Sequence, residues 1–513
     1  MNMKLKEIAF VGAVAGGALL APLFIMWGMR GLLPGYVPPP PPEPMFSMEE
    51  IARHTTAENC WVVIDGLVFN VTPASKVHPA AFRCGGNSSE NYHKNHGPVI
   101  RPQMMKLKIG TLAGEPQKSA AALTPEEKDT ENATLSPKRT LLAKEANWNP
   151  LDLMLVVERD RGSFLAIDSS THTPVARIEG VGYQPHTNVL SPDAAYTYLI
   201  SRDGWLTKID LKTFEPKKWA RVGTNSRGTA LTEDGKYLAV GNYEPGNVVL
   251  LDPATLEIIK TIELTAVIDG AIQRSRAGAL VEKGSKIIIA LKDLNSVWVV
   301  DTAQPALPVS EYYWNIGSKG GMLHDGFLTP DGKYFIVAAQ DSKEVWALNA
   351  DTMKEVARVP TGGKPHTGPG ATWGSTAFVP SLDEGLITAI DMRTWKPIRR
   401  IATGGPGLFV RSYYKDPSYP YIWADTAFGD HSDEVYVIDG KKLEIVKTII
   451  SMPGKTSIHP EFTRDGKYVY VLVWGGDKIY VYDAYTLEEV TTMDATTPSV
   501  ISNVGIRLEE PGI

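Results

Sequence analysis

The sequence predicts a mainly β fold, in which an eight-bladed β-propeller follows a small α+β domain and one N-terminal transmembrane helix. A repeat of about 40–50 residues fills the second part of the chain and is typical of propeller blades. Alternating apolar and polar residues, with DG turns between them, indicate the strands of each repeat. An uncharged apolar run near the N-terminus predicts the transmembrane helix.

The composition is that of a globular protein. Of 513 residues, 43% are hydrophobic and 21% are charged, and 58 acidic against 52 basic residues give a net charge of −6. No long basic run is interleaved with aromatic residues, as a nucleic-acid groove would require. We therefore expect no nucleic-acid partner.

Residues 1–30 are predicted to form a membrane anchor. The run Ile8–Met29 carries no charge and is long enough for one membrane-spanning helix, which needs about 20 residues. A cleaved signal peptide is the alternative, but its apolar core is usually only about 7–15 residues. Lys4 and Lys6, with the free amine, outweigh Arg30 beyond the run, so the N-terminus is expected in the cytoplasm and the rest of the chain outside.

Two linkers are expected to separate the domains. Residues 31–44 contain consecutive prolines from 38 to 42, which favour an extended, semi-rigid spacer. A compact domain is expected over 45–115, and the polar stretch 116–147 reads as a second linker. The propeller is expected over 148–513.

The repeat reads (D)GKY, a strand, a turn, an apolar strand that ends in Asp, the pattern TxE and a further strand. Its strand-ending residue occurs eight times, which predicts eight blades of four strands. Closing the ring removes free sheet edges and brings loops of one face together around a central pocket. The eight residues are Asp168, Asp210, Asp252, Asp301, Asn349, Asp391, Asp439 and Asp483.

The small domain carries the motifs of a known haem-binding family. An opening helix FSMEEIARH, the hairpin CWVVIDGLVFNVT, a His-Pro pair, a CG turn, a second histidine and a closing IGTL follow one another. This pattern resembles the cytochrome b5 family, which implies haem b held between His78 and His96, with His93 as a rival for the second position. Two imidazoles would leave the iron six-coordinate and suited to electron transfer. HPAA stands here in place of the family's HPGG, and a relative of this fold without haem is the alternative.

The two cysteines of the chain, Cys60 and Cys84, both lie in this domain and can form one disulfide. The sequence contains no CxxCH motif for covalent haem attachment, so any haem is expected to be held non-covalently.

The propeller sequence resembles the d1-haem propeller of cytochrome cd1 nitrite reductase. The resemblance rests on GYQPHTNVLSPD, SRGTALTEDGKYLAVGNYEPG, TGGKPHTGPGATW, GGPGLFVRS and IHPEFTRDGKY. It implies that His186 is the proximal ligand of haem d1. It also implies that His366 is a distal-pocket histidine that donates hydrogen bonds or protons to a bound anion.

Haem d1 carries several carboxylates, so its pocket needs fixed cations. Arg159, Arg202, Arg227 and Arg276 each fall at an entry or turn of the first four blades, where forked guanidinium groups can bind carboxylates. Tyr243, in GNYEPG, is a further candidate donor. Each of these residues could instead be an ordinary surface group.

One departure from the reductase pattern bears on function. The family's second distal histidine has no counterpart, because Ser381 stands near that position. His459, in SIHPEF, instead resembles relatives that bind or modify haem d1 during its biosynthesis, and its imidazole could close a six-coordinate haem. His324, in LHDG, is expected to be structural.

Three functions are therefore compared. The first is a membrane-anchored oxidoreductase that passes electrons from a b5-like haem to a d1-type haem, which reduces nitrite to nitric oxide with His366 or His459 as catalytic residues. The second is a dehydrogenase or binding protein in d1-haem maturation. The third is a non-catalytic propeller that binds a partner.

The first function implies several partners and a place in the cell. The expected partners are an electron donor (a small cytochrome, a cupredoxin or a membrane quinol-linked protein), a small anion and, through the anchor, the membrane. A homodimer is compatible with the sequence. The expected location is the inner membrane, with a single pass and the bulk of the chain in the periplasm.

Overall fold

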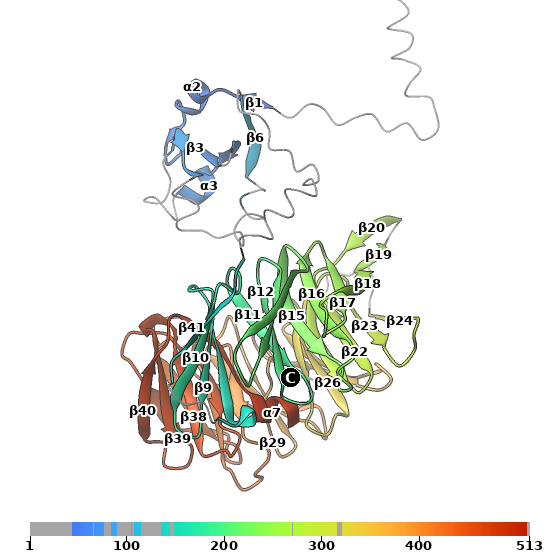
Figure 1. Cartoon of the computed structure of the whole chain (residues 1–513), viewed down its shortest axis with the longest axis vertical. Helices are drawn as coiled ribbons and strands as arrows, with labels where there is room; N and C mark the ends of the chain where they lie inside the picture. The colour runs from blue at the N-terminus through green and yellow to red at the C-terminus, as the bar shows by residue number, and fades with distance from the viewer. Residues whose placement is uncertain are drawn as a thin grey trace, which may run out of the picture. The chain divides into compact units, whose positions relative to one another are not determined.

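The computed structural model describes residues 44–64, 66–75, 84–89, 104, 107–113, 135–143, 148–268, 270–314 and 321–509. The chain divides into two compact units, with the boundary between residues 121 and 122. Figure 1 shows both units, which are considered separately below.

The first unit contains a mixed sheet with strand order β1-β6-β4-β3-β2, and β5 pairs with β3. Its strands are β1 (Met45–Phe46), β2 (Thr55–Thr56), β3 (Asn59–Ile64), β4 (Leu67–Asn70), β5 (Gly86–Asn87) and β6 (Lys108–Leu112). The helices α2 (Met48–Ile51) and α3 (Thr72–Ser75) complete it. The hairpin β3–β4 is the CWVVIDGLVFNVT segment of the sequence, and its apolar residues Val62, Val63 and Val68 are fully buried.

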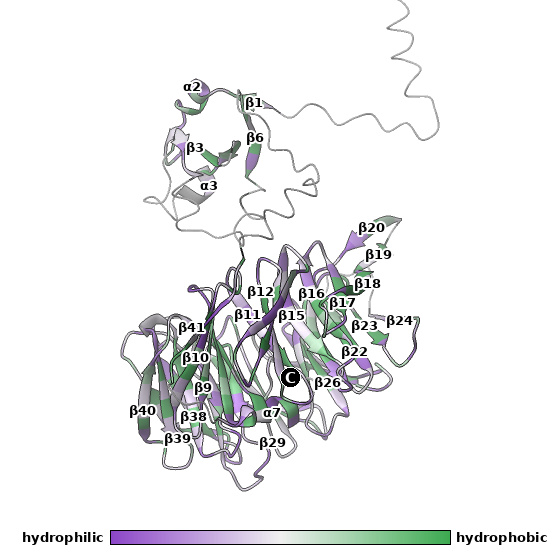
Figure 2. Cartoon of the chain, in the orientation of Figure 1, coloured by the Kyte–Doolittle hydropathy of each residue, from purple (hydrophilic) through white to green (hydrophobic). Residues whose placement is uncertain are grey.

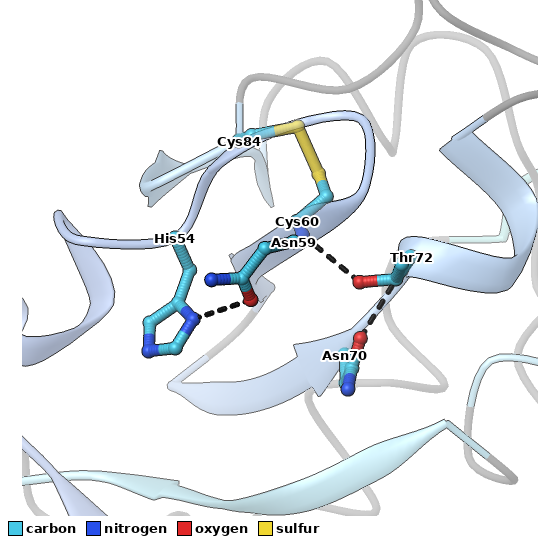
Figure 3. The surroundings of a disulfide bond; sticks show 6 residues. All are labelled: His54, Asn59, Cys60, Asn70, Thr72 and Cys84. Carbon is cyan, nitrogen blue, oxygen red and sulfur yellow. Dashed lines mark hydrogen bonds between the residues drawn. A yellow bond between two sulfur atoms is a disulfide. The ribbon is translucent and has the colours of Figure 1, made fainter.

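Cys60 and Cys84 form a disulfide (Figure 3). The bond joins the first residues of β3 to the turn that precedes β5, which pairs with β3 in parallel. The N–H of Cys60 donates to Thr72 Oγ1 at 2.9 Å, so the same point is also held to the start of α3.

No helix among the described residues is long and apolar enough to cross a membrane. The run 8–29, predicted to be the anchor, lies outside the described residues. Residues 31–43 of the Pro-rich linker and residues 116–134 of the polar linker lie outside them as well.

The second unit contains eight antiparallel sheets of four or five strands among the described residues. The first sheet consists of β41 (Pro498–Asn503), β8 (Leu153–Glu158), β9 (Ser163–Asp168), β10 (Thr173–Glu179) and β7 (Lys138–Leu141). The second consists of β11 (Pro185–Leu190), β12 (Tyr196–Ser201), β13 (Trp205–Asp210) and β14 (Pro216–Arg221). The third consists of β15 (Asn225–Leu231), β16 (Leu238–Glu244), β17 (Asn247–Leu251) and β18 (Ile258–Glu263).

The remaining five sheets follow in chain order. The fourth has β21 (Ala277–Lys283), β22 (Lys286–Leu291), β23 (Ser296–Asp301) and β24 (Val309–Tyr313), and the fifth has β25 (Leu323–Leu328), β26 (Tyr334–Ala339), β27 (Glu344–Asn349) and β28 (Glu355–Pro360). The sixth has β29 (Thr372–Trp373), β30 (Thr376–Pro380), β31 (Leu386–Asp391) and β32 (Lys396–Ala402). The seventh has β33 (Val410–Ser412), β34 (Tyr421–Asp425), β35 (Glu434–Asp439) and β36 (Glu444–Ile450), and the eighth has β37 (Ser457–Phe462), β38 (Tyr468–Val473), β39 (Lys478–Asp483) and β40 (Glu489–Asp494).

This succession of small sheets is consistent with the predicted propeller. Strand β41 pairs with β8, so the first and last strands of the repeat array lie in one sheet. This pairing ties the two ends of the array together. Outside the sheets lie the hairpin β19 (Thr265–Ile268) and β20 (Ala271–Arg274), the single turns η2 (Pro150–Asp152) and η3 (Trp474–Gly476), and the helix α7 (Val504–Glu509).

The repeated residues make the turns of each sheet. In the TPDGK segment, Asp331 accepts the N–H of Lys333 and the hydroxyl of Thr329, while Gly332 has a φ of 66°, which favours glycine. The strand-ending Asp252 likewise accepts the N–H groups of Ala254 and Thr255. The repeat is therefore a repeat of hydrogen-bonded turns between apolar strands.

Hydrophobic residues are concentrated within the strands (Figure 2). Middle strands such as β22 and β38 are buried along nearly their whole length. The core lies between adjacent sheets, since one buried cluster joins Leu155 and Phe164 of the first sheet to Leu199 and Ile209 of the second.

Candidate functional site

All eight sheets of the second unit contribute residues to one cavity of about 680 Å³. The first strand of each sheet, or the segment just before it, lines this cavity, so the first strands are the innermost. The volume falls within the range of roughly 300–1,000 Å³ found for cofactor and small-molecule sites. Its lining combines apolar residues such as Phe409 and Val500 with several cations and histidines.

β-Bulges recur in the inner strands at the level of the cavity. The pairing register shifts around His186 in β11, around Arg227 in β15, across His324 and Asp325 in β25, and around His459 in β37. A bulge adds a residue to one strand and redirects its side chain. At each of these four places, a bulge therefore directs candidate side chains towards the same cavity.

The position after the second strand of a sheet also faces the cavity. Arg159 follows β8, Arg202 follows β12, Lys292 follows β22 and Trp474 follows β38, and all four line the cavity. Tyr243 lies near the end of β16 and lines it as well. The turns that follow the second strands therefore form part of the cavity wall.

His186 is held in one tautomer. Its Nδ1 lies 2.9 Å from the carbonyl oxygen of Arg227, so Nδ1 carries the proton and Nε2 is left as the basic nitrogen. Burial, together with the charges of Arg202 and Arg227, lowers the pKa of His186 well below its usual value. A neutral imidazole with a free Nε2 is the form that binds a metal ion.

Three of the predicted arginines line the cavity, and not all of their N–H groups have a hydrogen-bond acceptor among the described residues. The Nε atoms of Arg159, Arg202 and Arg227 are buried and have no hydrogen-bond partner. Burial and the neighbouring Arg227 and Arg159 lower the pKa of Arg202 to about 9. Cations held in this way are costly unless an anion binds, so the cavity suits a ligand with several carboxylates.

Tyr243 lies at the centre of this group of cations. The guanidinium carbons of Arg227 and Arg276 lie 4.8 and 5.5 Å from its ring centroid, and Lys292 Nζ lies 2.9 Å from its hydroxyl oxygen. Arg276 differs from the other three arginines, because it does not itself line the cavity; it forms a close ion pair with Asp293 at 2.6 Å.

Lys292 was not predicted from the sequence. Its side chain is buried, and burial with the nearby charge of Arg276 lowers its pKa to about 7. The dipeptides Arg159-Asp160, Arg202-Asp203 and Lys292-Asp293 occupy the same place in their repeats, and comparing the repeats position by position would have found this lysine.

His366 lies in the segment before the sixth sheet and also lines the cavity. Its Nδ1 lies 2.8 Å from the carbonyl oxygen of Leu408 and 3.4 Å from Asp325 Oδ2. His324, expected to be structural, lines the cavity too, and its ring centroid lies 5.8 Å from that of His366.

His324, Asp325 and His366 each offer a ligand atom within 4.8 Å of the others, a spacing that could hold a metal ion. However, Asp325 Oδ2 already accepts two main-chain N–H groups and His366 Nδ1 donates to Leu408. The arrangement is therefore a hydrogen-bonded network rather than an open set of ligands.

His459 is buried and stacks on Phe409, with ring centroids 4.0 Å apart. Burial, with the charges of Arg411 and Arg507, lowers its pKa well below the usual value, although a main-chain hydrogen bond to Ser499 acts in the opposite direction. Its Nε2 is buried and has no hydrogen-bond partner among the described residues. The N–H of Ile501, 3.4 Å from Nδ1, is at the long limit of hydrogen bonding.

Asp425 holds the main chain on both sides of this stack. Its Oδ1 accepts the N–H groups of Leu408 and Phe409, and its Oδ2 accepts the N–H of His459 at 3.0 Å. Burial raises the pKa of Asp425 to about 6.

Ser381, which stands near the position of the reductase family's second distal histidine, is turned into its own loop. Its hydroxyl donates to Asp383 Oδ1 at 3.0 Å, and the side chain is 1% exposed and does not line the cavity. The predicted b-haem ligands His78 and His96, and the rival His93, lie outside the described residues.

Comparison with known proteins identifies both units. Residues 148–506 match the Cytochrome D1 heme domain, and residues 47–99 match the Cytochrome b5-like Heme/Steroid binding domain. The chain is 35% identical to a dihydro-heme d1 dehydrogenase of Pseudomonas aeruginosa, over 70% of this chain and 72% of that protein. It is 26% identical to a nitrite reductase of Stutzerimonas stutzeri, over 74% of each.

A solved structure, that of the dihydro-heme d1 dehydrogenase NirN in complex with DHE, matches with a TM-score of 0.66 and 30% identity. The match covers 83% of this chain and 89% of that one. The expected cofactor class is confirmed, because both matched families are haem-binding families. The unpartnered cations and the basic Nε2 of His186 fit an anionic tetrapyrrole. The chain belongs to the Cytochrome D1 heme domain family and carries a cytochrome b5-like domain ahead of that domain.

Proposed function

We propose that this protein is an oxidoreductase of d1-haem maturation that removes two hydrogens from a dihydro-haem d1 substrate. The alternative from the sequence is thus preferred to nitrite reduction. Support comes from the greater identity to the dehydrogenase, 35% against 26% for the nitrite reductase. Ser381, which is turned into its own loop, stands near the position of the reductase family's second distal histidine and offers no imidazole there.

The observation that carries the proposal is the unpartnered Nε2 of His459 in the wall of the cavity. Removing two hydrogens breaks two C–H bonds, forms one C=C bond and releases two protons and two electrons. A neutral, buried imidazole with one free nitrogen is suited to take the first proton. A main-chain hydrogen bond to Ser499 and its stacking on Phe409 hold the ring in the orientation that this step needs.

The other cavity residues bind and orient the substrate. His186 would ligate the tetrapyrrole iron through Nε2, because its Nδ1 is committed to the Arg227 carbonyl. Arg159, Arg202, Arg227 and Lys292 would bind the substrate carboxylates. When bound, the iron macrocycle supplies the conjugated system through which the substrate electrons leave.

The b5-like domain would accept these electrons one at a time and pass them to an electron-transfer protein, such as a small cytochrome, a cupredoxin or a quinol-linked membrane protein. The match of residues 47–99 to the cytochrome b5-like family supports this electron-transfer role.

The cellular location follows as part of the same proposal. A single-pass anchor over 8–29 would leave both haem domains in the periplasm. The Cys60–Cys84 disulfide supports an oxidising compartment, since disulfides are rare where thiols are kept reduced.

The test is turnover of the full-length chain with dihydro-haem d1 and an excess of an oxidised acceptor. The product is expected to lack two hydrogens by mass spectrometry. His459→Gln should lower kcat by roughly 10²–10⁴, the range for losing a general base. His431→Gln is the matched control, because His431 lies on the surface and pairs only with Glu434. Nitric oxide formation from nitrite and a reductant, without dehydrogenation, would overturn the proposal in favour of a reductase.

A further inference from the structure

Asp325 makes an unusual set of contacts at the cavity wall. It lies in the bulge of β25, and its Oδ2 accepts the main-chain N–H groups of both Thr367 and Gly368. Its own carbonyl oxygen accepts the hydroxyl of Thr367 at 2.8 Å. One residue of the fifth sheet therefore holds the segment that begins the sixth.

The segment held in this way carries His366. Asp325 Oδ2 lies 3.4 Å from His366 Nδ1, and the N–H of His366 itself donates to the carbonyl of Pro380 at 3.1 Å. Gly368 packs closely, since a Cβ there would lie 3.3 Å from Asp325 Oδ2. The position of the His366 imidazole is therefore set by its contact with this carboxylate and not by the pairing of a regular strand.

The second carboxylate oxygen faces another histidine. Asp325 Oδ1 lies 3.2 Å from His324 Nδ1, an ion-pair approach in which neither atom makes a well-formed hydrogen bond. Burial alone would raise the pKa of Asp325, but His366, His324 and the N–H of Gly368 outweigh it and hold the pKa well below its usual range. Asp325 is therefore an anion between two cavity imidazoles.

Lys292 lies close enough to Asp325 to feel its charge. Burial and the charge of Arg276 lower the pKa of Lys292, and the negative charge of Asp325 opposes this shift only in part. Asp325 is consequently an anionic residue close to the cationic side chains of this wall, whereas Glu461, the other acidic residue that lines the cavity, pairs with Arg411. Replacing it would leave main-chain N–H groups without an acceptor and two imidazoles without a counter-charge.

We propose that Asp325 is a positioning residue, whose carboxylate fixes the placement and proton arrangement of His366 and His324 at the cavity wall. Its carboxylate oxygens face the two imidazoles and the main-chain N–H groups of Thr367 and Gly368, so the residue acts through the imidazoles and through the 366–368 segment. The effect of Asp325 on turnover rests on the proposed function. Its effect on the placement of the two imidazoles does not depend on that function.

The placement can be tested without any haem. The full-length chain, labelled with ¹⁵N in its histidines, gives long-range proton–nitrogen spectra in which each imidazole reports its own protonation and surroundings. His366 and His324 are identified by the signals that His366→Gln and His324→Gln remove. Asp325→Asn and Asp325→Ala should shift both sets of signals and leave those of His186 in place.

Asp351→Asn is the matched control, because Asp351 lies in the same part of the chain, is 67% exposed and pairs only with Lys283. It should leave every imidazole signal unchanged. If Asp325→Ala fails to fold, Asp325→Asn keeps the test valid, since its amide oxygen still accepts the two N–H groups. A folded Asp325 variant with unmoved His366 and His324 signals would overturn the proposal.

A second readout separates this inference from the proposed function. In the presence of dihydro-haem d1, turnover by Asp325→Asn should fall roughly 10–100-fold, the range for losing a group that orients an active-site ligand. Shifted imidazole signals in a protein that never turns over this substrate would uphold the positioning role while refuting the dehydrogenase.

Discussion

The cavity histidines differ in the partners of their ring nitrogens. Nδ1 of His186 donates to the Arg227 carbonyl, and Nδ1 of His366 lies within hydrogen-bond distance of the Leu408 carbonyl. His459 is instead distinguished by a buried Nε2 that has no partner. These differences assign iron ligation to His186 and proton transfer to His459 within the proposed mechanism.

His186→Ala should remove the axial ligand while leaving the arginines in place. We expect the affinity for haem d1 to fall by more than the roughly 10–100-fold typical of losing an outer partner of a metal ligand. Absorption titration of the full-length chain measures this. His431→Ala should bind like the wild type, and a His186→Ala variant with unchanged affinity and spectrum would transfer the ligand role to another residue.

Asp425 predicts a pH dependence of stability. Its pKa in the folded chain, about 6, lies above the value of about 3.9 for an unfolded chain. The folded state therefore binds this proton more tightly, and the contribution of Asp425 to stability grows as pH falls from about 7 towards 4 and is lost as pH rises through 6.

The pH effect is measured as the difference in unfolding free energy between the wild type and Asp425→Asn at several pH values. Relative to the variant, the wild type should gain stability on acidification over this window. Asp351→Asn controls for the general effect of losing one surface carboxylate. A difference that does not vary with pH would show that Asp425 keeps an ordinary pKa.

Some of the site was accessible from residue identity and some was not. His186, His366, His459, Arg159, Arg202, Arg227 and Tyr243, all named from the sequence, line one cavity. Lys292 was missed because a lysine in a turn is usually a solvated surface residue. Asp325 and Asp425 were missed because their roles depend on hydrogen bonds to residues 17 to 42 positions away in the sequence, which no local pattern reveals.

At the scale of the elements, strands were predictable and bulges were not. The DGK turns and strand-ending aspartates mark where strands begin and end, because those residues make local hydrogen bonds. The bulges at His186 and His459 depend on pairing between strands, so alternation along one strand cannot locate them. Yet it is the bulges that turn these histidines to the cavity.

The seventh and eighth sheets are joined by a buried ion pair. Arg411, in β33, donates to Glu461 Oε1, in β37, at 3.0 Å, and both side chains are 2% exposed. Arg411→Met would leave the Glu461 carboxylate buried without its partner, which should cost about 3–5 kcal/mol of unfolding free energy.

Urea unfolding of the full-length chain measures this cost. The double variant Arg411→Met/Glu461→Met should recover most of the loss, because it removes both buried charges. Arg393→Met is the control, since Arg393 pairs with Asp391 at the surface and should matter little. An Arg411→Met variant as stable as the wild type would show that the ion pair does not stabilise the contact between the two sheets.

At the scale of the whole molecule, the order of the parts was predictable from composition and repetition. Eight repeats predicted the eight sheets of four or five strands that the second unit contains among the described residues, because each repeat is one supersecondary unit that buries its faces against its neighbours. The end of the polar stretch was assigned to the linker, whereas Lys138–Leu141 forms β7 at the edge of the first sheet. A short, charged edge strand has little pattern of its own and is stabilised by its partner.

The disulfide predicts separate behaviour of the two units. Cys60 and Cys84 are 24 residues apart, and both lie in the first unit. Removing the crosslink by Cys60→Ser/Cys84→Ser should destabilise that unit by about 3 kcal/mol, because the unfolded chain regains conformational freedom. The second unit should unfold unchanged.

Calorimetry of the full-length chain with and without a reductant measures the disulfide effect in the same molecule. The transition of the first unit should move to lower temperature, and the double serine variant should match the reduced wild type. Identical transitions in all samples would show that the disulfide does not stabilise the first unit.

In the proposed mechanism, electrons removed from a d1-type substrate in the propeller reach the haem of the b5-like domain. The most direct test is a single-turnover, stopped-flow experiment in which the full-length chain, with oxidised haem b, is mixed with dihydro-haem d1 and one equivalent of an oxidised one-electron acceptor, because one haem b holds only one of the two electrons released. Reduction of haem b and formation of haem d1 should proceed together, and His459→Gln should slow both. Haem b that stays oxidised while the substrate is dehydrogenated, or a substrate that binds and is never dehydrogenated, would contradict it.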